Sequence, residues 1–164
     1  MVTDASLWGI GGVLYWHSRA VAYFSDELHP CDLNRFRACK GDSAFTTVWE
    51  ALVILVGLRA WAPLFNSFDA VRIRSGSHGS LSAIAKLSTS SSALNQVICE
   101  LALDSSLAGF ALKELCHIPG ISNTVADALS RAFSPDPEPW PHELDGAVKT
   151  TLPLRDHSFY RSRV

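Results

Sequence analysis

Length, composition and charge limit what this protein can be. The chain has 164 residues, 48% hydrophobic and 18% charged, which excludes a disordered chain and predicts one folded domain with a sizeable core. Its net charge of −2 provides no general attraction for nucleic acid, so binding to a polyanion would need a local basic cluster.

The sequence also carries features that bear on its compartment. The four cysteines show no spacing typical of a metal site or a disulfide framework, and we expect reduced thiols in an intracellular protein, cytoplasmic or nuclear. No basic segment followed by an apolar one precedes Asp4, so no secretory signal is expected. The longest apolar segment has an uncharged run only over residues 51–58, which is too short to span a membrane. A soluble protein is predicted.

The first half of the chain predicts strands followed by one long helix. Residues 2–25 combine β-branched and aromatic residues around a Gly-rich turn, which indicates three short strands joined by tight turns. Residues 26–42 contain Pro and Gly without a clear period, and such long loops are often functional. Ser43 is expected to cap a helix that ends at about Trp61, before Pro63.

The second half adds two strands and three helices. A strand is expected at residues 70–75, a short helix at 80–87 and a fifth strand from Phe110 to 118. Ser91 or Ser92 is expected to cap a further helix, whose apolar residues have the i, i+3, i+4, i+7 spacing. These are Leu94, Val97, Ile98 and Leu101.

The last helix and the fold class complete this prediction. Asn123 is expected to cap a helix through Arg131, after which the composition becomes Pro-rich and acidic. We therefore divide the chain into a domain at residues 1–133 and a C-terminal tail at 134–164. The order βββ-α-β-α-α-β-α predicts an α/β (α+β) fold in which helices flank a five-stranded mixed sheet.

Three carboxylates stand at positions where such side chains are unusual. Glu50 lies on a helix that is apolar nearly all round, where a carboxylate is costly unless it is paired or binds a metal. Asp4 interrupts an apolar strand, and Asp is depleted in strands. Asp127 lies opposite the apolar face of the last helix. The simpler alternatives are a narrow polar stripe for Glu50, a strand-end turn for Asp4 and a solvated helix position for Asp127.

Four segments, taken together and in order, resemble a known family. They are TDAS at 3–6, GIGGVLY at 9–15, WEAL at 49–52 and HIPGISNTVADALSR at 117–131. This set resembles a type 1 ribonuclease H domain, and more narrowly the ribonuclease H domain of retrotransposon reverse transcriptases. The resemblance covers residues 2–133 and implies a ribonuclease H-like fold with the element order given above.

The resemblance also implies a reaction and a set of site residues. Members of the family hydrolyse the RNA strand of RNA–DNA hybrids with two Mg²⁺ ions, and Mn²⁺ is a possible substitute. The family uses four carboxylates, and Asp4, Glu50 and Asp127 match the first, second and fourth. His117 has the spacing to Asn123 and Asp127 of members whose loop histidine assists proton transfer or product release. Judged alone, His117 would be a polar residue at a strand end.

The third family carboxylate is missing. It belongs at the end of the fourth strand, where this chain has Ser75-Gly76-Ser77, and the nearest preceding acid, Asp69, begins that strand at its opposite end. Loss of one such electrostatic stabiliser costs on the order of 10²–10³ in rate. His78 is not expected to replace it, because imidazole suits zinc or manganese better than magnesium. Impaired catalysis and doubtful metal occupancy are therefore predicted.

Candidate contacts to the substrate lie in two places. The loop segment NRFRACK at residues 34–40 holds Arg35 and Arg37 in the best basic cluster of the chain, which we expect to grip the phosphate backbone of a hybrid. The alternative is an ordinary solvated loop. Ser6, Ser77 and Asn123, next to the acidic residues, are further candidates for contacts to the RNA strand.

Three interpretations remain open at this point. The first is a ribonuclease H domain, active or impaired, from a larger polyprotein that includes a reverse transcriptase polymerase domain. The second is a non-catalytic, connection-like module that supports a polymerase or binds hybrid. The third is an unrelated α/β hydrolase that uses Ser and His, but the sequence lacks the G-x-S-x-G segment of that class.

Overall fold

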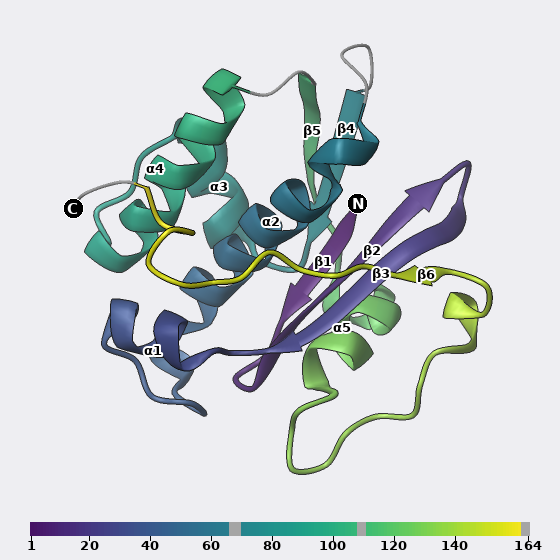
Figure 1. Cartoon of the computed structure of the whole chain (residues 1–164). Coiled ribbons are helices and arrows are strands. Elements are labelled where there is room, and N and C mark those ends of the chain that lie inside the picture. The colour runs from purple at the N-terminus through teal and green to yellow at the C-terminus, as the bar shows by residue number, and fades with distance from the viewer. Residues whose placement is uncertain (66–69, 108–110, 162–164) are drawn as a thin grey trace.

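A six-stranded mixed sheet forms the centre of the molecule, with helices on both of its faces (Figure 1). The computed structural model describes residues 1–65, 70–107 and 111–161, and for residues 107, 111 and 112 it describes the backbone only. Asp69 and Phe110, which were expected at the starts of two strands, lie outside the described residues. The predicted α/β class with a mixed sheet is confirmed, with one strand more than the expected five.

The strands are β1 (Val2–Ala5), β2 (Gly9–Trp16), β3 (Arg19–Glu27), β4 (Ala70–Ser75), β5 (Ala111–His117) and β6 (Val148–Lys149). The α-helices are α1 (Pro30–Phe36), α2 (Thr46–Trp61), α3 (His78–Lys86), α4 (Ser92–Leu107) and α5 (Thr124–Arg131). Short 3-10 turns are η1 (Ser43–Phe45), η2 (Ala62–Leu64), η3 (Gly120–Ser122) and η4 (His142–Leu144).

The sheet order is β5-β4-β1-β2-β3-β6. The antiparallel pairs β1–β2 and β2–β3 form the predicted meander, and Asp4 lies opposite Gly11 in the first of them. The pairs β1–β4, β4–β5 and β3–β6 are parallel. Because β1, β4 and β5 run in the same direction, their carboxyl ends meet at one edge of the sheet, which is where open α/β sheets bind ligands.

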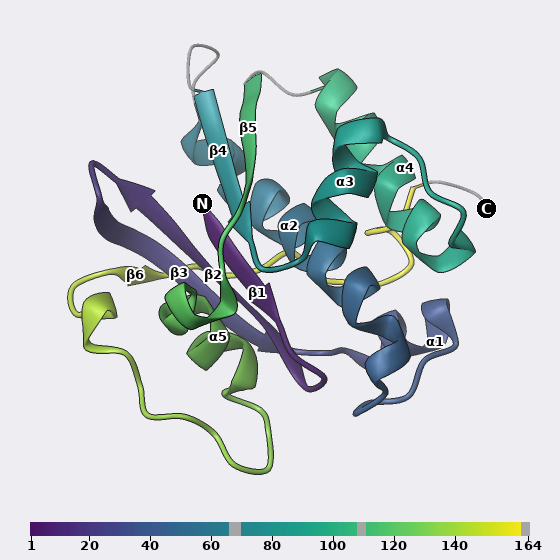
Figure 2. The same ribbon diagram turned by 180° about the vertical axis from the view of Figure 1, so that it is seen from behind.

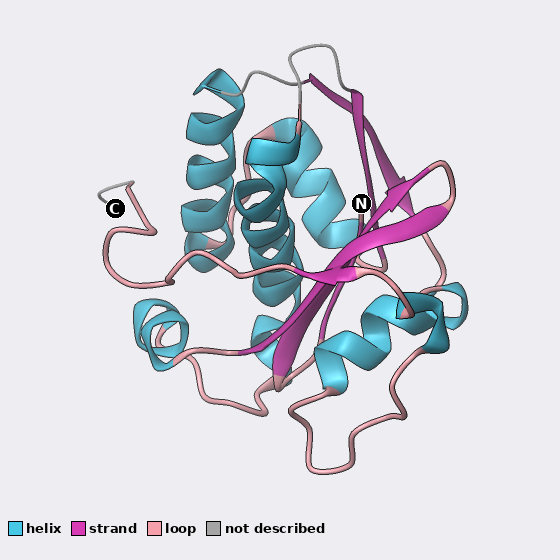
Figure 3. Cartoon of the chain, turned by 45° about the vertical axis from the view of Figure 1, so that its right-hand side comes forward, coloured by secondary structure: helices cyan, strands magenta, loops and turns pink. Residues whose placement is uncertain are grey.

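Helix α2 is the centre of the larger hydrophobic core. Helices α2, α3 and α4 lie on one face of the sheet and α5 on the other (Figure 3). Every residue of α2 from Val48 to Leu58 is buried, which explains why its sequence is apolar nearly all round. The helix ends at Trp61 as predicted, but Ser43 is not its cap. Asp42 instead caps the preceding turn η1, by accepting a hydrogen bond from the backbone N–H of Ala44 at 2.9 Å.

The same segment is long and apolar enough to cross a membrane when judged by length and composition alone. This stretch, Ser43–Leu64, has 22 residues with a mean hydropathy of 1.4. By that test it could span a membrane, in contrast to the sequence-based expectation that the apolar run is too short. The fold gives the hydropathy another cause. Packing against the sheet and against α3 and α4 covers most of the segment, as in the core helix of a water-soluble domain.

The glycines of GIGGVLY lie inside β2 and not in a turn, in contrast to the sequence-based expectation. A Cβ atom on Gly11 would lie 2.6 Å from the carbonyl oxygen of Ala126 and 2.6 Å from the Cβ of Leu129. Helix α5 therefore lies directly on the backbone of β2, at a distance that only glycine permits. The turn between β1 and β2 is formed by residues 6–8, where the Ser6 backbone N–H donates to the carbonyl oxygen of Gly9.

The expected loop at residues 26–42 contains the helix α1. Pro30 occupies its first turn, and a capping box joins His29 and Asp32. The helix ends at Phe36 and is followed by Arg37, its C-cap, which adopts the left-handed conformation with φ 52°. Seven residues are too few to show a helical period in the sequence, which is why the pattern there was interpreted as a loop.

Part of the segment 134–161, expected to be a tail, folds back onto the domain. Val148 and Lys149 pair with Ala22 and Tyr23 of β3 and form the sixth strand. The chain then crosses α2, and its last described residues lie near α4 (Figure 1). A two-residue strand has no recognisable sequence pattern, and only its pairing with β3 defines it.

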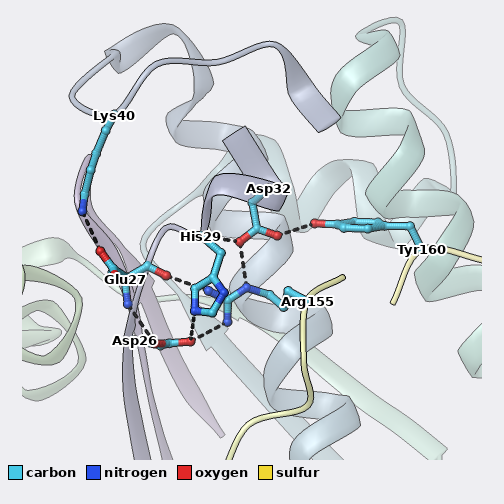
Figure 4. Close-up of polar contacts among 7 residues, drawn as sticks. All are labelled: Asp26, Glu27, His29, Asp32, Lys40, Arg155 and Tyr160. Carbon is cyan, nitrogen blue, oxygen red and sulfur yellow. Dashed lines mark hydrogen bonds and ion pairs between the residues drawn. The ribbon is translucent and has the colours of Figure 1, made fainter. Parts of the chain in front are cut away.

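A buried polar cluster holds this segment in place (Figure 4). The guanidinium of Arg155, only 2% exposed, donates to Asp32 and to Asp26 at 2.7 Å each. The hydroxyl of Tyr160 donates to the other oxygen of Asp32 at 2.9 Å. Asp32 also accepts from the backbone N–H of His29 at 3.2 Å. We call Asp26, Asp32, Arg155 and Tyr160 the C-terminal clasp.

Candidate active site

The carboxyl ends of β1, β4 and β5 carry the residues that the sequence singled out. Asp4 belongs to β1, Gly76 directly follows β4, and His117 ends β5. Helix α2 contributes Glu50 from one face of the sheet, and α5 contributes Asp127 from the other. The topology thus brings together, at one edge, residues that are far apart in the chain.

Asp4 is held by two side chains from the region of α5. Its Oδ1 accepts a hydrogen bond from the amide of Asn123 at 3.1 Å, and its Oδ2 accepts from the hydroxyl of Ser130 at 2.8 Å. Burial raises the pKa of Asp4 to about 7, and the charge of Asp127 adds to this rise, while the two hydrogen bonds oppose it. Asp4 lies near the end of β1 but is paired with Gly11 inside the strand and is not part of the turn, which was the simpler alternative for it.

Glu50 is buried deeper than Asp4. The hydroxyl of Ser75, at the end of β4, donates to its Oε2 at 3.0 Å. Burial raises the pKa of Glu50 to about 8, with a further contribution from the charge of Asp4. Glu50 is 6% exposed, so it does not lie on a solvated polar stripe. Two poorly solvated carboxylates, one of which raises the pKa of the other, favour a bound proton or a bound cation.

Asp127 is directed partly away from this pair. Its Oδ1 accepts from the guanidinium of Arg131, one helical turn later, at 2.8 Å. Its charge still raises the pKa of both Asp4 and Glu50, so it belongs to the same electrostatic cluster. In the part of the chain that the structure describes, no three His, Cys, Asp or Glu side chains are grouped closely enough to hold a metal ion.

The position of Gly76 is open and does not require glycine. A Cβ built there would lie 3.9 Å from Oδ1 of Asp4 and 4.0 Å from the carbonyl oxygen of Ile118, which are ordinary contact distances. Its backbone is outside the left-handed region that favours glycine. A longer side chain at this position would therefore begin beside Asp4.

Two histidines lie next to this position. His117 Nε2 is 3.1 Å from the carbonyl oxygen of Gly76, and the His117 ring stacks on that of His78 with centroids 3.6 Å apart. Both side chains are exposed. The His117 side chain, for which the resemblance implies a role in proton transfer or product release, thus lies beside the open position at Gly76.

The serine candidates have structural roles. Ser6 donates to the carbonyl oxygen of Ser130 at 2.7 Å and accepts from the backbone of Trp8 and Gly9. Ser77 caps α3 by accepting from the backbone N–H of Ser80 at 3.2 Å. The sequence analysis missed Ser75 and Ser130, which bind the two carboxylates.

Arg35 and Arg37 lie apart from the carboxylates. Together with Asn34 they line a groove of about 670 Å³ between α1, the beginning of α4 and the C-terminal segment. Arg37 is exposed, while Arg35 lies over the ring of Tyr160 at 4.6 Å. Lys40 is paired with Glu27 at 2.9 Å and does not line this groove.

Comparison with known proteins identifies the fold. No protein-family model matches the sequence, and no curated protein matches it. Among solved structures, the chain is similar to the crystal structure of RNase H1 from the halophilic archaeon Halobacterium salinarum NRC-1. The similarity covers 80% of this chain and 92% of that chain, with a TM-score of 0.62 and 19% sequence identity. The chain therefore has the ribonuclease H fold, as the sequence predicted, and similarity at this identity extends to the fold alone.

Proposed function

We propose that this chain is a ribonuclease H-type domain of a retroelement reverse transcriptase, acting on the RNA strand of RNA–DNA hybrids, with catalysis impaired at Gly76. The observation that carries the proposal is the buried pair of Asp4 and Glu50, with the Gly76 position open beside Asp4. On this proposal the domain belongs to a larger polyprotein with a polymerase domain and acts in the cytoplasm or nucleus.

The donor set suits the cation that the family uses. Carboxylate oxygens are the ligands that Mg²⁺ prefers, and Asp4, Glu50 and Asp127 are the residues that would hold it. When bound, the metal supplies an activated water and a clamp on the oxygens of the phosphate. The chain's own contribution is to hold Asp4 and Glu50 through Ser130, Asn123 and Ser75. Arg131 is paired with Oδ1 of Asp127 and competes with a cation for this carboxylate, and the residue at position 76 supplies no ligand, so the set is one ligand short.

The missing carboxylate explains why weak catalysis is expected. Restoring it with Gly76→Asp places a carboxylate beside Asp4 without a backbone change, because the position tolerates a Cβ. We expect Gly76→Asp to cleave the RNA strand of an end-labelled hybrid on the order of 10²–10³ times faster than the parent chain, in Mg²⁺ and in Mn²⁺. Gly76→Asn, of the same size without the charge, is the matched control and should stay at the parent rate.

Two outcomes would refute this account of Gly76. If the parent chain cuts hybrid as fast as Gly76→Asp, another group supplies the ligand. If Gly76→Asn accelerates cleavage as much as Gly76→Asp, the effect is one of size and not of metal ligation.

Hybrid binding is assigned to the groove beside Arg35 and Arg37. Phosphate contacts dominate such binding, and each lost contact lowers the slope of log affinity against log salt by up to about 0.9. We expect Arg35→Ala and Arg37→Ala together to weaken hybrid binding and reduce that slope, measured by fluorescence anisotropy at several salt concentrations. An unchanged slope would show that this cluster is an ordinary solvated surface.

A non-catalytic, hybrid-binding module is the second candidate. The pairing of Asp127 with Arg131 favours it, because a structural ion pair then occupies a position that the enzyme needs for its metal. Metal titration by calorimetry separates the two candidates. Binding that is lost in Asp4→Asn and Glu50→Gln supports the ribonuclease, and no binding in the parent chain or in Gly76→Asp supports the module.

A further inference from the structure

A second groove lies on the sheet face that α2, α3 and α4 do not cover. Helix α5 packs on β1, β2 and β3 of this face, and β4 and β5 lie beside it (Figure 2). Every second side chain of β4 is exposed on this face. The groove, of about 610 Å³, is bounded by β4 and β5 on one side and by the β2–β3 hairpin, η3 and α5 on the other. We call it the basic groove, after three of its lining residues. These are Arg72, Arg74 and Lys113.

The charge of the basic groove is one-sided. Arg74 and Lys113 are exposed, and Arg72 is paired with Glu114 of the neighbouring strand. Among the described residues that line the groove, none is acidic. In a chain whose net charge is −2, Arg74 and Lys113 beside a hollow without a lining carboxylate create a local positive potential, while Glu114 offsets the charge of Arg72.

The side chains and their spacing match a polyanion. Arg72 and Arg74 alternate with buried residues on β4, so they project from the same face about 7 Å apart, as a row of cations along one strand. The opposite wall offers the hydroxyls of Ser18 and Ser122 and the ring of Tyr15. Cations that follow a backbone, together with an aromatic ring and hydroxyl donors, are the chemistry of sites that bind single-stranded nucleic acid.

The basic groove is continuous with the candidate active site. Asn123 lines the groove, and its amide also binds the Asp4 carboxylate at 3.1 Å. A nucleic acid strand that reaches the carboxylates can therefore continue past Asn123 into the groove. An acidic peptide would be attracted to the groove but repelled by the carboxylates. The hairpin and α5 wall the groove on the side opposite β4, which favours one strand over a wider duplex.

We propose that the basic groove binds the sugar–phosphate backbone of an unpaired nucleic acid strand. That the strand enters the groove from the carboxylates rests on the proposed function. That the groove binds a sugar–phosphate backbone rests on its lining residues alone. The bound strand would be the part of the RNA that extends beyond the hybrid.

Binding of a fluorescein-labelled oligouridine, followed by anisotropy over a range of salt concentrations, tests the proposal. We expect Arg74→Gln with Lys113→Gln to weaken binding about tenfold and to lower the salt slope by about 0.7 for each lost contact. Arg72 is left in place because its removal would unpair Glu114. The matched control is Lys86→Gln with Lys149→Gln, which removes the same charge from exposed positions outside the groove and should bind as the parent chain does.

The proposal is overturned if the groove variant binds oligouridine like the parent chain, or if the control loses as much affinity. It is also overturned if polyglutamate displaces the oligonucleotide as effectively as unlabelled oligouridine, because the groove would then suit an acidic protein. The probe contains no hybrid, so its binding can fail while hybrid cleavage by Gly76→Asp succeeds, and the reverse. Unchanged thermal unfolding of both variants confirms that each is folded.

Discussion

The fold places Asp4 and Glu50 where burial disfavours the ionised form of both carboxyl groups. Ser130, Asn123 and Ser75 each donate a hydrogen bond that favours the ionised form, yet the pKa of both carboxyls lies well above the ordinary value. Desolvation therefore outweighs the hydrogen bonds at both residues. A binding site for a cation has this property, because a bound cation stabilises the ionised carboxylates in place of the water that burial excludes.

This balance predicts a stability that depends on pH. The pKa of Glu50 is raised from 4.5 to about 8, so its contribution is fully present below the unfolded value and is lost as pH rises through about 8. Glu50→Gln, which never ionises, escapes that loss. In urea unfolding without divalent cations, we expect the two proteins to differ little at about pH 5, and the variant to be more stable by on the order of 3 kcal/mol at about pH 8.

An exposed carboxylate is the control for this comparison. Glu143→Gln removes the same charge from the surface and should give a difference in unfolding free energy that hardly changes between the two pH values. If Glu50→Gln behaves in the same way, the pKa of Glu50 is not raised by the fold.

At the scale of elements, the sequence predicted most of what periodicity determines and one of the three expected caps; Ser43 does not cap α2, and the Asn123 side chain makes no capping hydrogen bond at α5. The alternation of β4, the apolar face of α4 and the cap at Ser91 all occur in the structure, since each depends on neighbouring residues in the chain. The glycines of β2 were predicted to form a turn, whereas tertiary contacts require them: Gly9 and Gly11 allow the close approach of α5, and Gly12 faces the ring of Phe24. Helix α1 and strand β6 were missed because each is too short to show a period.

The candidate site was predictable to a similar extent. Asp4 and Glu50 were found because a carboxylate in an apolar element is conspicuous, and the structure brings them together. The hydrogen bonds of Ser75 and Ser130 were not found, because a serine in a helix or at a strand end has many simpler explanations. The ion pair of Asp127 with Arg131 has the common i, i+4 spacing, which says nothing about competition with a metal.

The C-terminal clasp carries a prediction at the same scale. Asp32 and the Arg155 side chain are essentially inaccessible to water, so Arg155→Met would leave Asp32 as a buried charge without its cation. Removing one partner of such a pair typically costs about 3–5 kcal/mol. We expect a loss of that size in the free energy of unfolding, measured in urea, with partial recovery when Asp32→Asn is added.

Arg161 provides the comparison for Arg155. It also forms ion pairs with acidic residues, Glu100 and Asp104, but its side chain is 44% exposed. Arg161→Met should therefore change the free energy of unfolding by less than about 1 kcal/mol. Equal losses in Arg155→Met and Arg161→Met would mean that burial does not make the Arg155 ion pairs more important for stability than exposed ones.

For the whole molecule, the clasp bears on where the domain ends. The boundary at residue 133 was placed from composition, yet the following segment supplies β6, the buried side chains of Leu144 and Phe159, and the ring of Tyr160 beside Phe36. Trp140 also lies against Tyr23 of β3, with ring centroids 5.5 Å apart. A Pro-rich, acidic composition describes the surface of this segment and not its contacts.

Deletion of residues 134–164 tests whether this segment is part of the folding unit. The shortened chain leaves the Asp32 carboxylate without Arg155 or Tyr160, and it uncovers apolar surface around Phe36 and β3. We expect its Tm, followed by circular dichroism, to fall by about 10 °C or more. A loss of several kcal/mol is expected, and each kcal/mol lowers the Tm of a chain of this size by about 2–4 °C. Asp32→Asn in the shortened chain should recover part of the fall, since it removes the unpaired charge but leaves the apolar surface uncovered. An unchanged Tm would instead place the end of the domain at residue 133.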